Sequence, residues 1–246
     1  KLESFPAGLN ADEAALGYNA YSLLLTGKDE HGHPWPVNLE SFGDFKPALY
    51  AYILIPFIKV LGLTELAVRL PSAIFGILAV LFIYLLCKEI FSIQHSAFSI
   101  PEIAALMLAI SPWHLHFSRG AWETNVATTL ILIGTWAFLK GLKRPNYYLL
   151  SAISYTLSMY TYQSARVTVP LLGLGLILLF RPKRILPSIL LFFLLLLPLS
   201  LSLFSSGAAS RLSGVGLLAD EGPVNRAKEL RGQHADWGSP ESKVFH

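Results

Sequence analysis

Two acidic residues near the start of the chain are the first candidates for chemistry. Asp12 and Glu13 lie in the segment NADEAALGYNAYSLLLTG, where apolar residues recur at helical spacing. We therefore expect an amphipathic helix, capped by Asn10 or Asp12. Its apolar side would consist of Ala14, Leu16, Tyr18, Ala20, Tyr21 and Leu24. The two carboxylates either favour the helix N-terminus through the helix dipole or supply an acid/base group for catalysis.

Three basic side chains and a third acid are further candidates. Arg119 and Glu123 stand four residues apart in HFSRGAWETN, so on one continuous helix they share a face and can pair. Such a pair would belong either to a polar site or to the end of a helix. Arg166, in YTYQSARV, offers a planar fork that suits phosphate oxygens, or extends its charge to a membrane interface. Lys46, in DFKPAL, would contact a substrate phosphate or lipid headgroups in general.

Two histidines in the first part of the chain form a weak candidate for a metal site. His31 and His33 flank one glycine and could bind a divalent metal together with a nearby carboxylate. The acidic residues within reach are Asp29, Glu30 and Glu40. Histidines in a loop without a fixed scaffold are more often solvated, so the sequence implies no cofactor firmly and leaves a divalent metal open.

The composition indicates where these side chains operate. Of the 246 residues, 53% are hydrophobic and only 14% are charged, whereas about 25% are charged in an ordinary soluble domain. We therefore predict a membrane protein. The formal charge of +3 comes from scattered Lys and Arg, which excludes binding to nucleic acid through phosphate neutralisation. The single cysteine, Cys87, excludes a disulfide or a Cys-based metal site within the chain.

Long uncharged stretches predict an all-α, polytopic transmembrane helical bundle. A helix of about 20 residues spans a hydrocarbon core of roughly 30 Å, and we expect six spans. They are residues 70–87, 103–118, 124–139, 145–165, 167–180 and 185–210. The apolar segment 47–58 is too short to cross and is expected to lie in the interface as an amphipathic juxtamembrane helix. Residues 1–65 would form a first external loop, 66–204 the bundle, and 205–246 the start of a second external loop. Because the chain starts and stops as though in mid-protein, we expect further residues on both sides.

The distribution of basic residues predicts which side of the membrane each link faces. Cytoplasmic loops collect Lys and Arg. The alternate links on one side carry Lys88, Lys140, Lys143, Arg144, Arg181, Lys183 and Arg184. The opposite side would hold residues 1–46 and 205–246, together with Arg119, Glu123 and Arg166. In a bacterial-type inner membrane this is the periplasmic or extracellular face, and we expect the functional site there.

The order of four segments along the chain is informative. They are NADEAALGYNAYSLLLTG, DFKPALYAYILIPFIKVLGLTELAVRLPSAIFG, ISPWHLHFSRGAWETN and YTLSMYTYQSARVTVPLL, which cover most of residues 8–172. Together they resemble the bacterial branch of the protein O-mannosyltransferase superfamily, a GT-C group called family 39 that includes the lipid A aminoarabinose transferases. The resemblance implies that Asp12, with Glu13 beside it, lies at the reaction centre and that Lys46 holds a lipid phosphate. Arg119 and Glu123 match the block SR-x-A and the acid after it, although many relatives carry Asp at the latter place.

The resemblance implies a membrane glycosyltransferase that moves a sugar from polyprenyl phosphate to an acceptor hydroxyl with inversion at the anomeric carbon. Asp12 would be the general base, while Lys46 and the two arginines would stabilise charge on the phosphate. Tyr160 and Tyr162 would line the sugar pocket through ring stacking, or belong to the aromatic belt of a membrane protein. The partners implied are the sugar donor, membrane lipids and an acceptor that is a protein, a lipid or a glycan.

Two other functional classes also fit a chain with many spans. A transporter or lipid flippase would carry ionisable groups near the middle of its spans and an internal repeat. Here the charges lie at the ends of the predicted helices, and the two halves show no repeat. A non-catalytic scaffold subunit would keep its folding and its partner binding after the substitution Asp12→Asn, whereas a transferase would lose sugar transfer.

Overall fold

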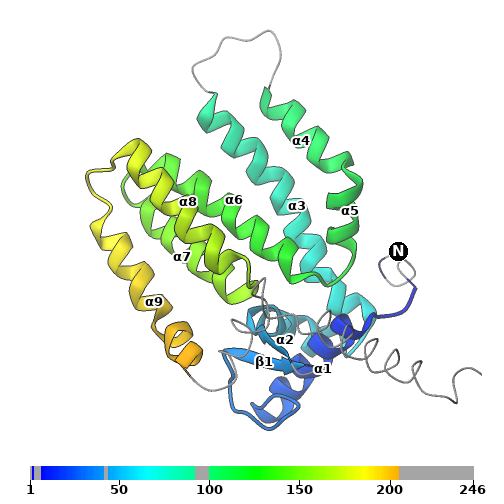
Figure 1. Ribbon diagram of the computed structural model, residues 1–246. Helices are drawn as coiled ribbons and strands as arrows, with labels where there is room; N and C mark the ends of the chain where they lie inside the picture. Colours follow the sequence, from blue (N-terminus) through cyan, green and yellow to red (C-terminus); the bar gives the residue numbers. More distant parts are fainter. Residues whose placement is uncertain (1, 3–6, 42–43, 92–99, 205–246) are drawn as a thin grey trace, which may run out of the picture. The chain divides into compact units, whose positions relative to one another are not determined.

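The computed structural model describes residue 2 and residues 7–41, 44–91 and 100–204. These residues form nine α-helices and one two-stranded sheet (Figure 1). Nearly all of them belong to one compact unit, Lys1–Ser202. The predicted external segment 205–246, and with it the end of the stretch 185–210, lies outside the described part of the chain.

The first helix, α1 (Ala11–Thr26), has strong signals at both of its ends. The Asn10 side chain accepts a hydrogen bond from the Glu13 N–H at 2.8 Å, and the Asn10 N–H donates to Glu13 Oε2 at 3.0 Å. This capping box satisfies two N–H groups reciprocally. Gly27 ends the helix in the left-handed conformation (φ 70°), which a residue without Cβ adopts most easily. Of the two expected caps, Asn10 is therefore the one that the structure uses.

An antiparallel hairpin follows α1 and is a small addition to a fold that is otherwise helical, in agreement with the predicted all-α class. Strands β1 (Asn38–Ser41) and β2 (Asp44–Pro47) pair in a register that places Leu39 opposite Lys46. Alternate residues of β1 are buried, Leu39 among them, as the pleat of a strand requires. Each strand is four residues long, and so short a stretch carries too little alternation for the sequence to predict it.

Helices α2 (Leu49–Leu61) and α3 (Glu65–Ile90) occupy the segments predicted as the interfacial helix and the first span. Thr64 caps α3, because its hydroxyl accepts a hydrogen bond from the Ala67 N–H at 3.2 Å. Among the described residues, the 26-residue α3 is the one helix long and apolar enough to cross a membrane. The apolar helix α2 is shorter, with 13 residues.

The stretch 103–118, predicted as one continuous span, is two helices. Helix α4 (Ile100–Ile110) ends before Ser111, and α5 (Pro112–Arg119) begins with the proline. Proline has no N–H to donate and disfavours the helical conformation in the residue before it. Ser111 is accordingly extended, with ψ 123°. The prediction was wrong here because it weighed the absence of charge and not Pro112.

The last four helices correspond to the remaining predicted stretches. They are α6 (Glu123–Gly141), α7 (Tyr147–Thr161), α8 (Ala165–Phe180) and α9 (Leu186–Phe204). Helices α6 and α7 pack closely because glycines of α6 lie against aromatic rings of α7. A Cβ added at Gly134 would come within 2.7 Å of the Tyr155 ring, and one added at Gly141 within 2.4 Å of the Tyr148 ring.

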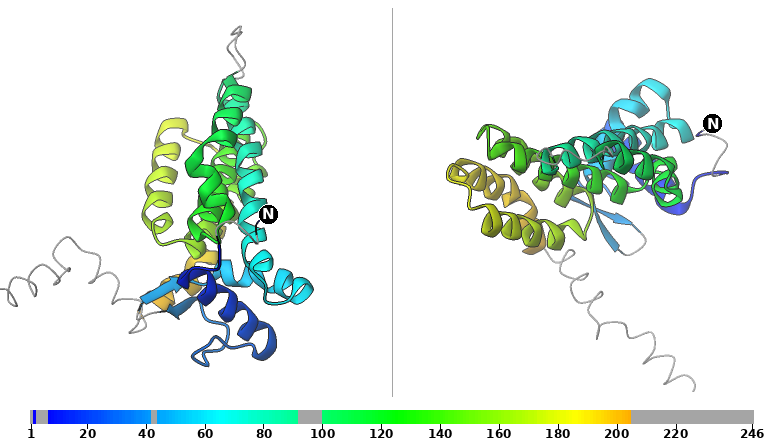
Figure 2. Two further views of the ribbon diagram at one scale, coloured as in Figure 1. Left: turned by 90° about the vertical axis from the view of Figure 1, so that its right-hand side faces the viewer. Right: turned by 90° about the horizontal axis from the view of Figure 1, so that it is seen from above.

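Two sets of charged residues lie at opposite ends of the long helices (Figures 1 and 2). At one end, α1, α2 and the hairpin pack against the beginnings of α3 and α6 around a core that includes Leu39, Leu54 and Val68. At the other end, the α6–α7 link reaches the end of α3, where Lys143 pairs with Glu89 at 2.5 Å. The predicted site residues thus lie at the hairpin end, and the basic links lie at the opposite end, as the charge pattern predicts.

Candidate functional site

A carboxylate and an ammonium group meet at the hairpin end. Asp12 lies in the first turn of α1, and Lys46 of strand β2 donates a hydrogen bond from Nζ to Asp12 Oδ1 in an ion pair. The register opposite Leu39 turns Lys46 toward the buried face of the hairpin, so only 17% of its side chain is exposed. Asp12 stays 47% exposed. The pair joins two residues predicted for one reaction centre and leaves the carboxylate accessible.

Glu123 is the second acid of this site. It is the first residue of α6 and precedes the uncharged stretch 124–139. Burial raises the pKa of Glu123; its own backbone N–H and the positive charge of Lys46 oppose the rise, and the carboxylate of Asp12 adds to it. Because Asp12 and Lys46 form an ion pair and both charges act on Glu123, we treat the three residues as one unit and call it the Asp12 cluster.

Glu13, the other predicted carboxylate, points into the protein. It binds Arg69 of α3 through both oxygens, each at 2.9 Å, and accepts a hydrogen bond from the Ala121 N–H at 2.9 Å. Burial favours the neutral acid, but the hydrogen bonds from Arg69, Ala121 and Asn10 and the charge of Arg69 outweigh it, so the pKa of Glu13 is lowered. Through these contacts Glu13 holds α1 in place, and thereby positions Asp12.

Arg69, the partner of Glu13, was not among the residues predicted for the site. Its side chain is fully buried, and it donates further hydrogen bonds to the backbone carbonyls of Leu2, at 2.8 Å, and Gly8. A signal was present, because Arg69 stands immediately before the uncharged stretch 70–87. A charge at such a place is costly unless it is paired, so the arginine itself predicts an acidic partner.

The predicted pairing of Arg119 with Glu123 depended on a helix that the structure interrupts. Helix α5 ends at Arg119, Gly120 is extended (ψ 169°), and α6 begins only at Glu123. The two residues therefore do not share the face of one helix, and that premise was wrong. Arg119 still lies at the hairpin end, because Ala121, two residues later, donates to Glu13.

Arg166, at the start of α8, is bound to the hairpin. Its guanidinium donates to Asn38 Oδ1 and Gln163 Oε1, each at 2.8 Å, and to the Met159 carbonyl at 3.3 Å. Among the described residues, no carboxylate forms an ion pair with it. Asn38 directly precedes Leu39, the residue that pairs with Lys46. Neighbouring residues of a strand point to opposite faces, so the side chains of Asn38 and Lys46 lie on opposite faces of the hairpin. Arg166 thus lies at the hairpin end but across the hairpin from Lys46.

The two tyrosines predicted for a sugar pocket have different environments. Tyr160 Oη donates to the Leu195 carbonyl at 2.8 Å and accepts from the Leu199 N–H at 3.1 Å, which ties α7 to α9. Tyr162 directly follows α7 and is 38% exposed. Its ring is available to a ligand, whereas the hydroxyl of Tyr160 is engaged in helix packing.

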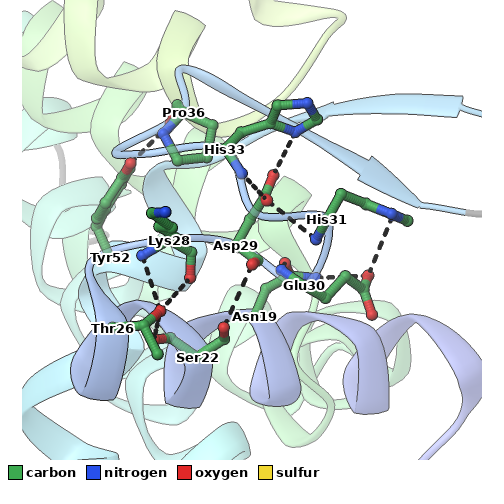
Figure 3. Close-up of polar contacts among 10 residues, drawn as sticks. All are labelled: Asn19, Ser22, Thr26, Lys28, Asp29, Glu30, His31, His33, Pro36 and Tyr52. Carbon is green, nitrogen blue, oxygen red and sulfur yellow. Dashed lines mark hydrogen bonds and ion pairs between the residues drawn. The ribbon is translucent and has the colours of Figure 1, made fainter.

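The loop with His31 and His33 is organised around a buried carboxylate (Figure 3). Asp29 Oδ1 accepts hydrogen bonds from the N–H groups of His31 and His33 at 3.0 and 2.8 Å, and Oδ2 is 3.2 Å from His33 Nδ1. Glu30 accepts a hydrogen bond from Asn19 of α1 at 2.8 Å, and its Oε1 lies 3.9 Å from His31 Nε2. In the part of the chain that the structure describes, no group of three or more His, Cys, Asp or Glu side chains could hold a metal. These contacts account for both histidines as parts of a structured loop.

The fold and the site together define a class: a helical protein with a helix able to cross a membrane and a carboxylate–ammonium cluster at the end of its helices. A family model described as dolichyl-phosphate-mannose-protein mannosyltransferase matches residues 45–207. The chain belongs to this family. No curated protein and no solved structure matches it. The matched segment includes Lys46, Glu123 and Arg166, while Asp12 precedes it. Membership supports a membrane glycosyltransferase.

Proposed function

We propose that this glycosyltransferase moves a sugar from a polyprenyl-phosphate donor to an acceptor hydroxyl, with inversion at the anomeric carbon. The reaction would take place on the periplasmic or extracellular face of a bacterial-type inner membrane. The ion pair between Asp12 and Lys46 beside Glu123 carries the proposal, because it combines a proton acceptor with a phosphate-binding cation. The family's description names a lipid-phosphate-linked mannose and a protein acceptor, which supports this class of donor.

In the proposed reaction, Asp12 acts as general base. The acceptor oxygen attacks the anomeric carbon from the face opposite the phosphate, and Asp12 takes the hydroxyl proton as the new bond forms. The bond between the anomeric carbon and the phosphate oxygen breaks, and polyprenyl phosphate leaves. Lys46 stabilises the negative charge that develops on that phosphate. The donor phosphate competes with Asp12 for the ammonium group, so donor binding frees the carboxylate to accept the proton.

Glu123 supports the same reaction through its raised pKa. At a given pH it is protonated more often than an ordinary glutamate, and a protonated acid donates a hydrogen bond to a phosphate oxygen that a carboxylate would repel. Arg119 and Arg166 add positive charge at the same end of the helices. Tyr162 is the tyrosine with a ring exposed for contact with the sugar.

Transfer of label tests the proposal. Membranes that contain the full-length protein are incubated with labelled polyprenyl-phosphate sugars, and the labelled product is identified. The variant Asp12→Asn is expected to lower the transfer rate by roughly 10²–10⁴-fold, the usual contribution of a general base. Glu102→Gln is the matched control, because Glu102 is an exposed acid on α4, and it is expected to keep wild-type activity.

The other functional classes give different results in the same membranes. A scaffold subunit would transfer no label and would bind its partners equally well with or without Asp12→Asn. A transporter or flippase would move the lipid-linked sugar across the membrane, and the label would remain on the lipid. Label that stays on the lipid for every donor tested contradicts the transferase proposal.

A further inference from the structure

Helices α7, α8 and α9, with Phe138 of α6, line a partly open cavity of about 400 Å³, a size within the range of small-molecule sites. Its wall is almost entirely apolar and includes Val169, Leu174, Ile189 and Phe192. Gly173 leaves part of that wall open, since a Cβ at this position would meet no atom within 4 Å. The chemistry of the wall suits a hydrocarbon chain.

A second hollow, of about 430 Å³, adjoins the cavity at Tyr148, which lines both. It lies between the α6–α7 link and the α8–α9 link, at the opposite end of the helices from the Asp12 cluster (Figure 1). The charged residues that line it are all basic: Lys143, Arg181, Lys183 and Arg184. Lys143 is paired with Glu89, whereas the other three form no ion pair within the described residues. Three positive charges thus adjoin an apolar cavity.

The backbone of Arg181 gives an independent reason to connect its side chain with a ligand. Arg181 ends α8 in the left-handed conformation, with φ 47° and ψ 55°. Glycine or asparagine is usual at this position, because a Cβ is strained there. Strain of this kind is characteristic of positions where the side chain serves a function. Here the retained side chain is one of the three guanidinium or ammonium groups beside the cavity.

Aromatic residues indicate the depth of the basic hollow in a membrane. Lys140 lies over the rings of Trp136 and Tyr147, 4.8 and 5.4 Å from their centroids. Trp and Tyr next to Lys are typical of the level of the lipid headgroups. The basic hollow would therefore lie at headgroup level, with the apolar cavity on its hydrocarbon side.

We propose that this end of the protein binds an anionic phospholipid, whose phosphate contacts Arg181, Lys183 and Arg184 and one of whose acyl chains fills the cavity between α7, α8 and α9. Anionic lipids are attracted to basic segments at the cytoplasmic surface of a membrane. A free phosphate would leave the cavity empty, and a neutral lipid would leave three cations unmatched. The site is separate from the Asp12 cluster and does not depend on sugar transfer.

Lipid retention by the full-length protein tests the proposal. The protein is placed in nanodiscs of phosphatidylcholine with phosphatidylglycerol, and the lipids that remain bound after release are counted by native mass spectrometry. The double variant Lys183→Gln, Arg184→Gln is expected to bind phosphatidylglycerol at least about tenfold more weakly. The control Lys28→Gln, Lys59→Gln removes the same charge from exposed lysines elsewhere and is expected to bind like the wild type.

Two single substitutions separate binding from folding. Arg181→Gly relieves the left-handed backbone, so we expect weaker binding of phosphatidylglycerol without a lower melting temperature. Gly173→Leu extends into open space and is expected to weaken binding by filling the cavity, although every cation is kept.

Three results would overturn the proposal. The first is equal retention of phosphatidylcholine, and the second is full competition by inorganic phosphate together with unchanged binding in Gly173→Leu. The third is stronger binding of polyprenyl phosphate than of phosphatidylglycerol at this site, which would assign the cavity to the sugar donor.

Discussion

Asp12 and Glu13 are neighbours in the chain, yet one is half exposed and the other is buried. Successive residues of an α-helix point about 100° apart, so α1 can direct Glu13 to Arg69 and Asp12 to Lys46. The buried pair fixes the rotation of α1 about its axis. It thereby determines where the exposed carboxylate lies.

The first prediction concerns this buried pair. Glu13→Gln is expected to lower the free energy of unfolding at pH 7 by about 3–5 kcal/mol, because Arg69 would keep a buried charge without its main partner. Glu65→Gln is the control, since Glu65 is 35% exposed and lies 3.8 Å from Arg69, and it should cost less than about 1 kcal/mol. Denaturant unfolding in detergent micelles measures both values, and equal losses would contradict the assignment.

The same pair predicts a dependence on pH. Because the pKa of Glu13 is lowered in the folded protein, its stabilisation is complete above the ordinary value of 4.5 and is lost as the pH falls through the folded value. The difference in unfolding free energy between the wild type and Glu13→Gln should therefore be constant near neutral pH and shrink below pH 4.5. Unfolding measured over a series of acidic buffers checks this, and a difference that grows toward acid would refute it.

Glu123 provides a prediction about the Asp12 cluster as a unit. Lys46→Met removes the positive charge that opposes protonation, so the pKa of Glu123 should rise further; Asp12→Asn removes a negative charge, so it should fall. Infrared titration of the carboxyl band measures both shifts. Lys28→Met, at an exposed lysine, is expected to leave the band unchanged, and shifts of the same sign in both cluster variants would contradict the coupling.

At the scale of elements, the sequence predicts most helices well and their interruptions poorly. The absence of charge is a property of a whole segment and does not depend on any single residue. It therefore predicts the positions of α3 and of α6 to α9 well. The break at Ser111 depends on a single proline, and the hairpin depends on pairing between strands of only four residues. Local patterns of hydrophobicity do not contain that information.

The packing of α6 on α7 predicts the effect of added methyl groups. Gly134→Ala would bring a Cβ within 2.7 Å of the Tyr155 ring, so we expect a loss of about 1–3 kcal/mol in unfolding free energy from overpacking. Gly175→Ala on α8 meets no atom within 4 Å and should be neutral or stabilise by up to about 1 kcal/mol through its helix propensity. Thermal unfolding compares the two, and equal effects would show that the close contact is unimportant.

The predicted part of the site consists of residues that local segments identify, whereas the missed part is a contact between distant segments. Asp12, Lys46 and Glu123 were recognised as chemical groups in a known order of segments, and the structure brings them into one cluster. The contact between Glu13 and Arg69 joins residues 56 positions apart. The position of Arg69 predicts an acidic partner, but only the folded arrangement of α1 against α3 specifies that this partner is Glu13.

At the scale of the whole molecule, the two charged ends of the helices predict opposite sides of a membrane. In a variant with Cys87→Ala, which removes the single cysteine, the substitutions Lys28→Cys and Lys183→Cys each introduce an exposed thiol. A maleimide that cannot cross membranes should label Lys28→Cys in intact cells and Lys183→Cys only after permeabilisation. Labelling of both thiols from outside would contradict this topology.

The hydroxyl of Tyr160 has a mechanical consequence for the apolar cavity. It donates to the Leu195 carbonyl and accepts from the Leu199 N–H, two groups that lie one helical turn apart on α9. Pro198, directly before Leu199, has no N–H to donate within the same turn. Rotation or sliding of α9 past α7 would break both bonds to the phenol, so these two walls are coupled. Any widening of the cavity would then fall to α8, which Arg166 ties to the hairpin at its beginning and which contains Pro170, a residue that removes one hydrogen bond from the helix.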